Sequence, residues 1–210
     1  MRPGLYAILD LDVLAGRDVA SFAERVLAAG SLAALQLRAK SAGAREALAA
    51  ARALAPLCAR AGVPFYVNDR PDLALLAGAT GVHVGGDDLP VADVRRFAPA
   101  LGTGRSTHRP DELDAGLATG ADYVAFGPVF ATSTKRDASP VTGLAPLADA
   151  SRRCRERGVP LVAIGGVTLD NAARVRDAGA TAAAVISALV VPDGQLTSHA
   201  RALHLALGGS

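Results

Sequence analysis

The sequence predicts an α/β fold, a single closed (β/α)8 TIM barrel that spans residues 1–210. Eight short apolar runs alternate strictly with eight longer helical stretches along the chain. Each run is continuously apolar, which is typical of parallel strands covered by helices on the outside. The length of 210 residues suits one domain of this kind. Eight repeated units favour a closed barrel over an open doubly wound sheet.

The first half of the chain contains four of these units. We expect strands at 5–9, 33–37, 64–67 and 81–85, and helices at 19–29, 44–61, 71–77 and 91–98. Gly30 and Gly62 fall just past the ends of the first two helices. Pro71 and Pro90 fall in the first turns of the next two. Both are the usual positions of these residues at helix ends.

The second half repeats the pattern. We expect strands at 102–106, 123–127, 161–165 and 183–187, and helices at 110–118, 144–157, 169–178 and 196–207. Pro110 opens a helix, and Gly120, Gly158 and Gly179 follow helix ends. One connection is unusually long: residues 128–143 separate the sixth strand from the next helix, and long loops in compact domains are often functional.

Composition excludes several classes of protein. Hydrophobic residues make up 50% and charged residues 20%, which is typical of a globular chain. Aromatic residues are only 4%, so the core must consist largely of Ala, Leu and Val. A net charge of +2 and dispersed basic residues argue against a nucleic-acid partner. No apolar stretch is long enough to span a membrane, and the N-terminus lacks the pattern of a signal peptide.

The two cysteines, Cys58 and Cys154, lie in predicted helices without a C-x-x-C motif or a Cys/His cluster. We therefore expect two unpaired thiols and a cytoplasmic location. The sequence leaves the oligomeric state open, and a homo-oligomer is among the states that it allows.

Candidate site residues stand at the predicted carboxyl ends of the strands, because these ends form the reactive face of a TIM barrel. In chain order they are Asp10 and Asp12; Gln36, Arg38 and Lys40; Asn68 and Asp69; His83, Asp87 and Asp88; Ser106 and His108; Thr132, Thr134 and Lys135; Gly165 and Gly166; Ile186 and Ser187.

Two chemistries are combined in this set. Asp69 and Asp88 suit a shared Mg²⁺ ion, and Arg38, Lys40 and Lys135 suit phosphate oxygens. Those lysines are the only two in a chain with 22 Lys and Arg residues, and lysine offers a compact point charge that arginine does not. A salt bridge at the barrel rim would explain any one of these charges. Five on one face favour a metal-bound diphosphate.

A second phosphate site is indicated at the last two strands. Gly165-Gly166 and Ile186-Ser187 follow the seventh and eighth strands, where barrels commonly bind a phosphate monoester with backbone N–H groups. A Gly-Gly pair alone also fits a tight turn. We therefore expect small-molecule phosphorylated substrates.

We expect the four histidines to lie in different environments. His83, inside the fourth strand, is interpreted as a hydrogen-bonded core residue. His108 fits a site residue and a helix contact about equally well. His199 and His204, in the last helix, are expected at the surface. No arrangement of the Ser-His-Asp or Cys-His type is present, and no dinucleotide-binding motif follows the first strand.

These motifs together resemble thiamine-phosphate synthase, in order and over almost the whole chain. The elements that carry the resemblance are Gln36-x-Arg38-x-Lys40, Asn68-Asp69, the run from Gly81 to Pro90, Ser106-Thr107-His108, the run from Asp122 to Phe130, Thr132-x-Thr134-Lys135, Ile164-Gly165-Gly166-Val167 and Val185-Ile186-Ser187.

The resemblance implies a transferase (EC 2.5.1.3) that joins hydroxymethylpyrimidine diphosphate to thiazole phosphate, or its carboxylated form, to give thiamine phosphate and pyrophosphate. It implies a dissociative reaction with Mg²⁺ as cofactor, held by Asp69 and Asp88. The implied contacts of the pyrimidine diphosphate are Gln36, Arg38, Lys40, Asn68, Ser106 and Lys135, of which Arg38, Lys40, Ser106 and Lys135 are the catalytic set. The implied contacts of the thiazole phosphate are Thr132, Thr134, Gly166, Ile186 and Ser187.

One position departs from the family pattern, and two alternatives stay open. Gly86 stands where the family usually has Gln, and Asp87 is a second candidate for the ligand role of Asp88. A thiazole tautomerase-like paralogue shares the fold and several motifs. A non-catalytic barrel that binds thiamine phosphate as a regulator would also retain the site.

Overall fold

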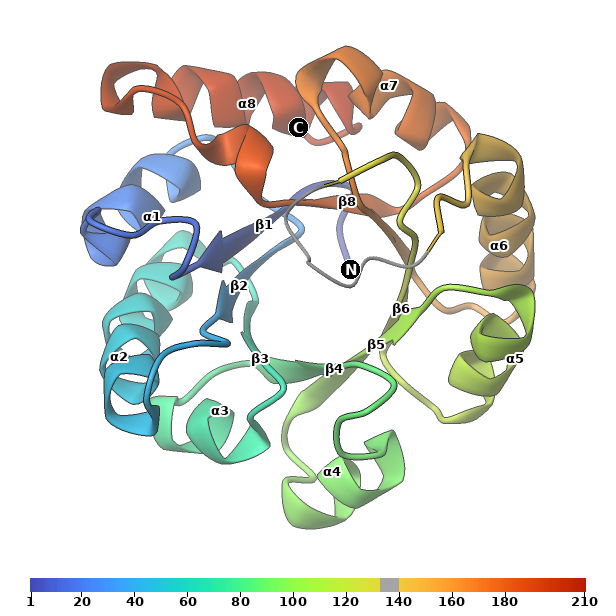
Figure 1. Cartoon of the computed structure of the whole chain (residues 1–210), viewed down its shortest axis with the longest axis horizontal. Helices are drawn as coiled ribbons and strands as arrows, with labels where there is room; N and C mark the ends of the chain where they lie inside the picture. Colours follow the sequence, from blue (N-terminus) through green and yellow to red (C-terminus); the bar gives the residue numbers. More distant parts are fainter. Residues whose placement is uncertain (133–139) are drawn as a thin grey trace.

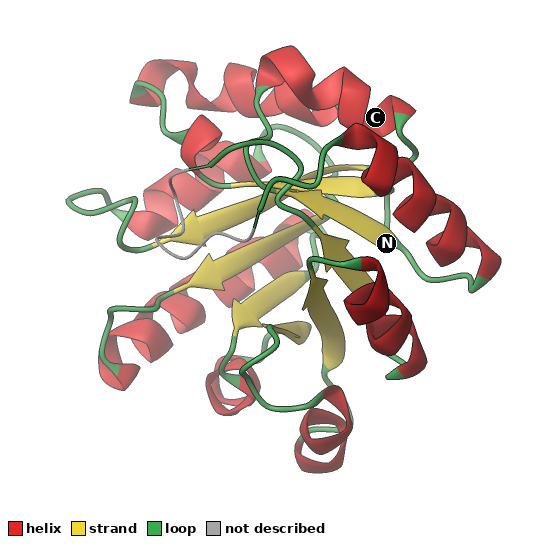
Figure 2. Cartoon of the chain, turned by 45° about the vertical axis from the view of Figure 1, so that its right-hand side comes forward, coloured by secondary structure: helices red, strands yellow, loops and turns green. Residues whose placement is uncertain are grey.

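The computed structural model describes residues 1–132 and 140–210 and confirms the predicted barrel. Eight strands pair in chain order, every neighbouring pair is parallel, and β1 pairs with β8 to close the sheet. The helices form a ring around the strands (Figure 1). Turning the molecule shows the strand arrows running towards one end of the barrel (Figure 2).

The strands are β1 (Gly4–Asp10), β2 (Ala34–Arg38), β3 (Phe65–Asn68), β4 (Gly81–Val84), β5 (Gly102–Thr107), β6 (Tyr123–Phe126), β7 (Leu161–Ile164) and β8 (Ala182–Val185). The helices are α1 (Val19–Leu27), α2 (Ala44–Ala61), α3 (Pro71–Ala77), α4 (Val91–Phe97), α5 (Pro110–Ala118), α6 (Leu144–Glu156), α7 (Leu169–Asp177) and α8 (Leu196–Ala206). Two short 3₁₀ helices, η1 (Ser187–Leu189) and η2 (Asp193–Gln195), lie between β8 and α8.

Helix ends follow the sequence signals closely. Helices α2, α3 and α5 begin and end where expected, and the other five end one or two residues early. Pro71 and Pro110 occupy the first turn of their helices, whereas Pro90 is the N-cap of α4 rather than a first-turn residue. The 3₁₀ helices were not expected, because three residues are too few to show a periodicity.

The barrel divides the core into two regions. Between sheet and helices lies an aliphatic layer of the expected Ala, Leu and Val side chains. Inside the barrel lies a smaller cluster that contains all three tyrosines of the chain, Tyr6, Tyr66 and Tyr123. Their ring centroids are 5.3 to 6.1 Å apart. The three tyrosines thus gather inside the barrel, and two of them, Tyr6 and Tyr123, line its mouth.

Two strand glycines make room for these rings. A Cβ added at Gly104 would lie 2.1 Å from Cζ of Tyr123, and one added at Gly81 would lie 2.5 Å from Cε1 of Tyr66. Neighbouring strands therefore supply a ring and the space for it, which sets the shape of the barrel interior below the site.

Two expectations about single residues can be checked here. Cys58 and Cys154 are buried and unpaired, as expected. His204 is buried, so the expectation that it lies at the surface was wrong. Its Nδ1 accepts a hydrogen bond of 3.2 Å from the N–H of Leu5, because α8 packs across the start of β1. His199 is partly exposed.

Within the described ranges, no helix is both long and apolar enough to cross a bilayer.

Candidate active site

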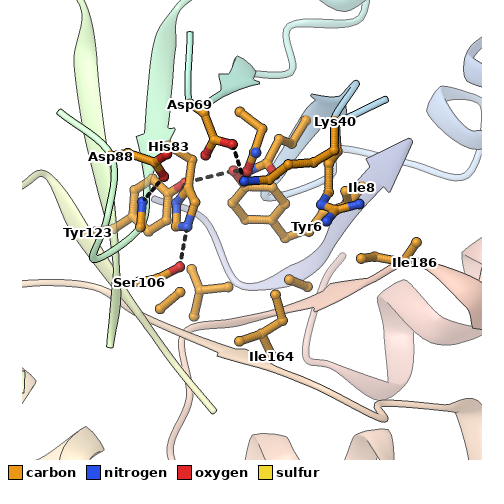
Figure 3. A pocket seen from close by; sticks show the side chains of 17 residues that line it. Tyr6, Ile8, Lys40, Asp69, His83, Asp88, Ser106, Tyr123, Ile164 and Ile186 are labelled. Carbon is orange, nitrogen blue, oxygen red and sulfur yellow. Dashed lines mark hydrogen bonds and ion pairs between the residues drawn. The ribbon is translucent and has the colours of Figure 1, made fainter. Parts of the chain in front are cut away.

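A pocket opens at the carboxyl ends of the strands. The space inside it, counted with the open mouth, is about 580 Å³. Side chains from all eight strands or their ends line it (Figure 3). They are Tyr6, Ile8, Gln36, Arg38, Lys40, Asn68, Asp69, His83, Gly85, Asp88, Ser106, Tyr123, Ala125, Val162, Ile164, Ala184 and Ile186.

The wall of the pocket has two chemically different sides. Strands β2 to β5 contribute its charged and hydrogen-bonding groups, whereas β6 to β8 contribute mainly aliphatic side chains. In Figure 3, Asp69 and Asp88 lie on one side and Ile164 and Ile186 on the other. Such a pocket can hold an anionic group against one wall and a flat, weakly polar ring against the other.

Arg38 is held by a buried carboxylate. Its guanidinium forms an ion pair with Asp10, whose side chain is 1% exposed. The two residues are register partners on β1 and β2, which places their side chains together. The other carboxylate oxygen of Asp10 accepts a hydrogen bond of 3.0 Å from the N–H of Asp12. The ion pair with buried Asp10 therefore holds Arg38 in place where it lines the pocket.

Lys40 lies just after β2 and pairs with a carboxylate at the end of the neighbouring strand, β3. Its Nζ lies 2.6 Å from Oδ2 of Asp69 at the end of β3, and its side chain remains half exposed. The ammonium group thus connects the cationic and the carboxylate parts of the site.

Asp69 adopts a backbone conformation that few side chains tolerate. Its φ angle is +63°, and it is the only non-glycine residue with positive φ in the described part of the chain. Asp is among the residues that enter this left-handed region most readily. The N–H of Asp69 donates to the carbonyl of His83 over 2.8 Å, which ties the turn to β4. This turn directs the carboxylate towards Asp88.

Asp69 and Asp88 form a facing pair of carboxyl groups. Burial raises the pKa of Asp69, and a hydrogen bond with Asp88 raises it further, against the opposing effect of Lys40. Burial acts to raise the pKa of Asp88 as well, but hydrogen bonds from Asp69 and from the N–H of Gly85, at 2.7 Å, leave it lowered. One carboxyl group therefore holds a proton more tightly than the other, as expected when two acids share a site.

This pair fits a magnesium ion. Mg²⁺ prefers oxygen ligands and often binds one or two carboxylates together with water and substrate phosphates. Residues 1–132 and 140–210 contain no group of three or more His, Cys, Asp or Glu side chains able to hold a metal.

His83 is buried and hydrogen-bonded, as the sequence indicates, but it also lines the pocket. Its Nδ1 lies 2.8 Å from the hydroxyl of Tyr123, and its Nε2 lies 2.8 Å from Oγ of Ser106. The sequence did not show on which side of the strand the ring lies, because a continuously apolar run has no alternation to reveal it.

The second predicted phosphate site lies beside this pocket. Gly165 and Gly166 have φ angles of +96° and +64° after β7. A Cβ added at Gly166 would lie 2.4 Å from the carbonyl oxygen of Ala131, so the loop after β6 runs against this turn. Ile186 lines the pocket, and Ser187 begins η1. Thr132 follows the loop residues that contact the glycine turn.

Some predicted residues lie elsewhere. Thr134 and Lys135 fall outside the described residues. His108 does not line the pocket; its Nδ1 lies 2.6 Å from the carbonyl oxygen of Gly127, and its N–H donates to Glu112. Asp87 is exposed and absent from the pocket wall, which favours Asp88 as the acid that faces Asp69.

The structure also adds residues that sequence reasoning missed as parts of the site. Asp10 stood at a strand end, but nothing in the sequence linked it to Arg38. Tyr6 and Tyr123 lie inside strands. Tyr123 falls in the run from Asp122 to Phe130 that carries the family resemblance, but nothing in the sequence assigned either tyrosine to the pocket. Their only common signal in the sequence is that tyrosine is rare: the chain has three tyrosines in 210 residues, and all three meet in one cluster.

Comparison with known proteins identifies the family. A family model described as thiamine monophosphate synthase matches residues 5–189. The chain belongs to this family. A thiamine-phosphate synthase of Methanoculleus marisnigri is 44% identical over 200 residues, covering 95% of this chain and 92% of the relative. Another, from Laribacter hongkongensis, is 45% identical over 186 residues, covering 88% and 86%.

Solved structures agree with this membership. A thiamine phosphate pyrophosphorylase from Pyrococcus furiosus superposes with a TM-score of 0.84 at 32% identity, covering 97% of this chain and 95% of that one. A 4-hydroxy-2-oxoglutarate aldolase/2-deydro-3-deoxyphosphogluconate aldolase superposes with a TM-score of 0.73 at only 21% identity, covering 97% of this chain and 94% of that one, which shows the shared barrel fold alone.

The departure of this member of the thiamine monophosphate synthase family at Gly86 is structurally mild. Gly86 is exposed, its φ angle is not positive, and a Cβ added there would meet nothing within 4 Å. A larger residue at this position would extend into open space beside the loop. The hydrogen bond from Gly85 to Asp88 does not depend on it.

Proposed function

We propose that this chain is a thiamine-phosphate synthase that acts as one catalytic domain. It condenses 4-amino-2-methyl-5-hydroxymethylpyrimidine diphosphate with 4-methyl-5-(2-hydroxyethyl)thiazole phosphate, or its carboxylated form, to give thiamine phosphate and pyrophosphate. The observation that carries the proposal is the meeting of Arg38, Lys40, Asp69 and Asp88 at one pocket with an aliphatic opposite wall.

The proposed contacts follow the two sides of the pocket. Arg38, Lys40 and Lys135 neutralise the diphosphate, and Asn68 and Ser106 donate hydrogen bonds to it or to the pyrimidine that Gln36 orients. The thiazole phosphate takes the neighbouring turn. Its proposed contacts are Thr132, Thr134, Gly166, Ile186 and Ser187. The aliphatic wall excludes water from the reacting rings.

The reaction exchanges one bond for another. The C–O bond between the pyrimidine methylene and the diphosphate breaks, and its electron pair leaves with pyrophosphate. The thiazole nitrogen then donates its lone pair to the resulting carbocation and forms the C–N bond. Since the uncarboxylated substrate transfers no proton in this exchange, the site needs cationic groups around the leaving group more than a general base. Mg²⁺ held by Asp69 and Asp88 would stabilise the developing charge on the diphosphate.

The two open alternatives are distinguished by one assay. Purified protein should release pyrophosphate only when both substrates and Mg²⁺ are present. Isomerisation of the thiazole phosphate without pyrophosphate release would instead support a tautomerase. Binding of thiamine phosphate without turnover would support a regulatory barrel.

We also propose that the protein works in the cytoplasm on small phosphorylated molecules, without a nucleic-acid or membrane partner. Two buried, unpaired cysteines suit a reducing compartment. A homo-oligomer stays a prediction, which a measurement of the protein's mass in solution tests.

A further inference from the structure

We infer that Tyr6, Tyr123 and His83 are positioning residues for Ser106. A chain of hydrogen bonds that begins at Gln36 sets the tautomer of His83, so that Ser106 turns its hydroxyl proton towards the ligand. The identity of that ligand as a diphosphate rests on the proposed function, whereas the hydrogen-bond chain does not.

This chain of hydrogen bonds crosses the inside of the barrel without a break. Nε2 of Gln36 lies 2.8 Å from the hydroxyl of Tyr6, which lies 2.7 Å from the hydroxyl of Tyr123. The Tyr123 hydroxyl lies 2.8 Å from Nδ1 of His83. On the other side of that ring, Nε2 lies 2.8 Å from Oγ of Ser106. Five strands, β2, β1, β6, β4 and β5, thus contribute one residue each.

The direction of donation follows from the first residue. The amide N–H of Gln36 donates to Tyr6, so the Tyr6 oxygen acts as an acceptor there. The Tyr6 proton then has Tyr123 as its acceptor. If Tyr123 donated to Tyr6 instead, the proton of Tyr6 would have no acceptor among the described residues, although the Tyr6 side chain is only 1% exposed. A buried polar group without a partner is costly, so the first direction is favoured.

The remaining bonds are determined in turn. Because Tyr123 accepts from Tyr6, its own proton is donated to Nδ1 of His83. A neutral imidazole carries one proton, which must then sit on Nε2 and point at Ser106. Ser106 accepts this bond and keeps its own proton for another partner. Within the described residues no other acceptor approaches that proton, and Ser106 lines the pocket.

Burial supports the protonated state of both phenols. It is the largest cause that raises the pKa of Tyr6 and the pKa of Tyr123 well above the ordinary value. The two hydroxyls therefore remain donors throughout the neutral range, and the direction of the chain does not reverse by loss of a proton.

The consequence for the reaction concerns the leaving group. A hydroxyl that offers its proton stabilises an anionic oxygen, and the charge on the diphosphate grows as the C–O bond breaks. A serine held as a donor therefore helps more in the transition state than in the ground state, which should appear in kcat rather than in KM.

The first experiment measures the tautomer in the free protein. Nitrogen-15 NMR distinguishes a protonated ring nitrogen from a bare one, and the signals of His83 are assigned by their loss in His83→Gln. We expect a proton on Nε2 and none on Nδ1. Gln36→Glu replaces the donor with an acceptor, so it should reverse the chain and move the proton to Nδ1. A wild-type ring protonated on Nδ1, or on both nitrogens, would overturn the inference.

The second experiment measures turnover in Tyr123→Phe, with Tyr66→Phe as the matched control. Tyr66 packs edge-on against Tyr123 with ring centroids 5.3 Å apart, but its hydroxyl takes no part in this chain. Loss of the bond to His83 should lower kcat about tenfold while KM for the diphosphate substrate changes about twofold or less, as a hydrogen bond lost mainly in the transition state predicts. Tyr66→Phe should keep wild-type kinetics.

A double variant tests whether Tyr123 acts through Ser106. In a Ser106→Ala background, Tyr123→Phe should have no further effect on kcat, because the proton it positions is gone. Additive losses would contradict the inference. Absence of pyrophosphate formation by the wild type would overturn the proposed function, yet the NMR result would still decide the hydrogen-bond chain.

Discussion

Asp69 combines an unusual backbone with a charge at the centre of the site. Its positive φ angle directs the carboxylate towards Asp88, and Lys40 approaches from the opposite side. Substitutions here must respect the backbone, because most side chains would add strain to any loss of charge. Asparagine tolerates the same conformation and so separates the two effects.

Asp69→Asn should therefore preserve the fold and lose the metal effect. Without Mg²⁺ its melting temperature should not fall below that of the wild type, since one of two facing negative charges is removed. Addition of Mg²⁺ should no longer raise the melting temperature, and pyrophosphate release should fall roughly 100-fold. Thermal unfolding with and without Mg²⁺ checks this, with the exposed Asp87→Asn as control. An undiminished Mg²⁺ shift in Asp69→Asn would remove Asp69 from the metal site.

Asp10 provides a second prediction, through Arg38. In Asp10→Asn the guanidinium keeps its place in the barrel but loses its buried counter-charge. We expect the unfolding free energy to fall by about 1–3 kcal/mol and KM for the diphosphate substrate to rise. Asp12→Asn is the control, since Asp12 contacts the exposed hydroxyl of Ser41 instead. Identical behaviour of the two variants in urea unfolding and kinetics would contradict the role of Asp10.

Lys135→Arg tests whether a point charge is required. Arginine keeps the positive charge but replaces the compact ammonium with a planar fork. If a single phosphate oxygen is the partner, turnover should fall at least about tenfold while the melting temperature stays the same. Full activity would show that any cation serves at this position.

Single residues differ in how well the sequence reveals them. Lys40, Asp69 and Asp88 follow strand ends, and parallel strands bring their ends to one edge, so their meeting could be predicted. Tyr6 and Tyr123 could not be placed, because every second residue of a barrel strand faces inward, and continuously apolar runs hide which ones do. Asp10 could not be paired with Arg38 without the strand register.

At the level of helices and strands, sequence signals and structure agree best where a cap marks the boundary. Helix α2 ends at Ala61 and is capped by Gly62 in the left-handed conformation, and α3 begins at Pro71, both as expected. Strand ends differ by one or two residues, since no comparable cap stops a strand. The two 3₁₀ helices are too short for any pattern to predict them.

The pairing of β5 with β6 yields a prediction about Gly104. In Gly104→Ala the new methyl group would collide with the Tyr123 ring, so the ring or the strand must shift. We expect a loss of about 1–3 kcal/mol in unfolding free energy, as for overpacked cores. Gly86→Ala, which meets open space, should change stability little. Urea unfolding of both variants checks this, and equal stability would show that the barrel absorbs the methyl group.

For the whole molecule, His204 joins the last helix to the first strand at the end of the barrel opposite the pocket. Gly4 packs directly against its ring, where a Cβ would lie 2.4 Å from Nδ1. Burial lowers the pKa of His204 below its ordinary value of 6.5. The fold therefore favours the neutral ring that accepts the hydrogen bond from Leu5.

The stability of the whole barrel should depend on this ring. As the pH falls below about 6.5, the unfolded chain binds the proton before the folded chain does. The contribution of His204 to the unfolding free energy should therefore be complete above pH 6.5 and should decrease between pH 6.5 and the lowered pKa of the folded state. His204→Asn should make the decline between pH 7 and pH 5 shallower, whereas His199→Gln should not. An unchanged slope in His204→Asn would show that other groups cause the acid sensitivity.

The closed order of eight strands was predictable because alternation and length leave few alternatives. The burial of His204 was not, since α8 has apolar residues on more than one side and the contact with β1 spans 199 positions of sequence. Contacts of such separation need the three-dimensional closure of the barrel, which no local pattern contains.

The close fit of the Tyr123 ring above Gly104 also has an evolutionary consequence. The two positions cannot vary independently, because a side chain at one occupies the space of the other. Across relatives of this barrel, we expect glycine opposite every tyrosine at this place and larger residues only where the ring has been lost. A drift from one pair to the other would have to pass through a sequence with a void, so the ring and its glycine should be inherited as a unit.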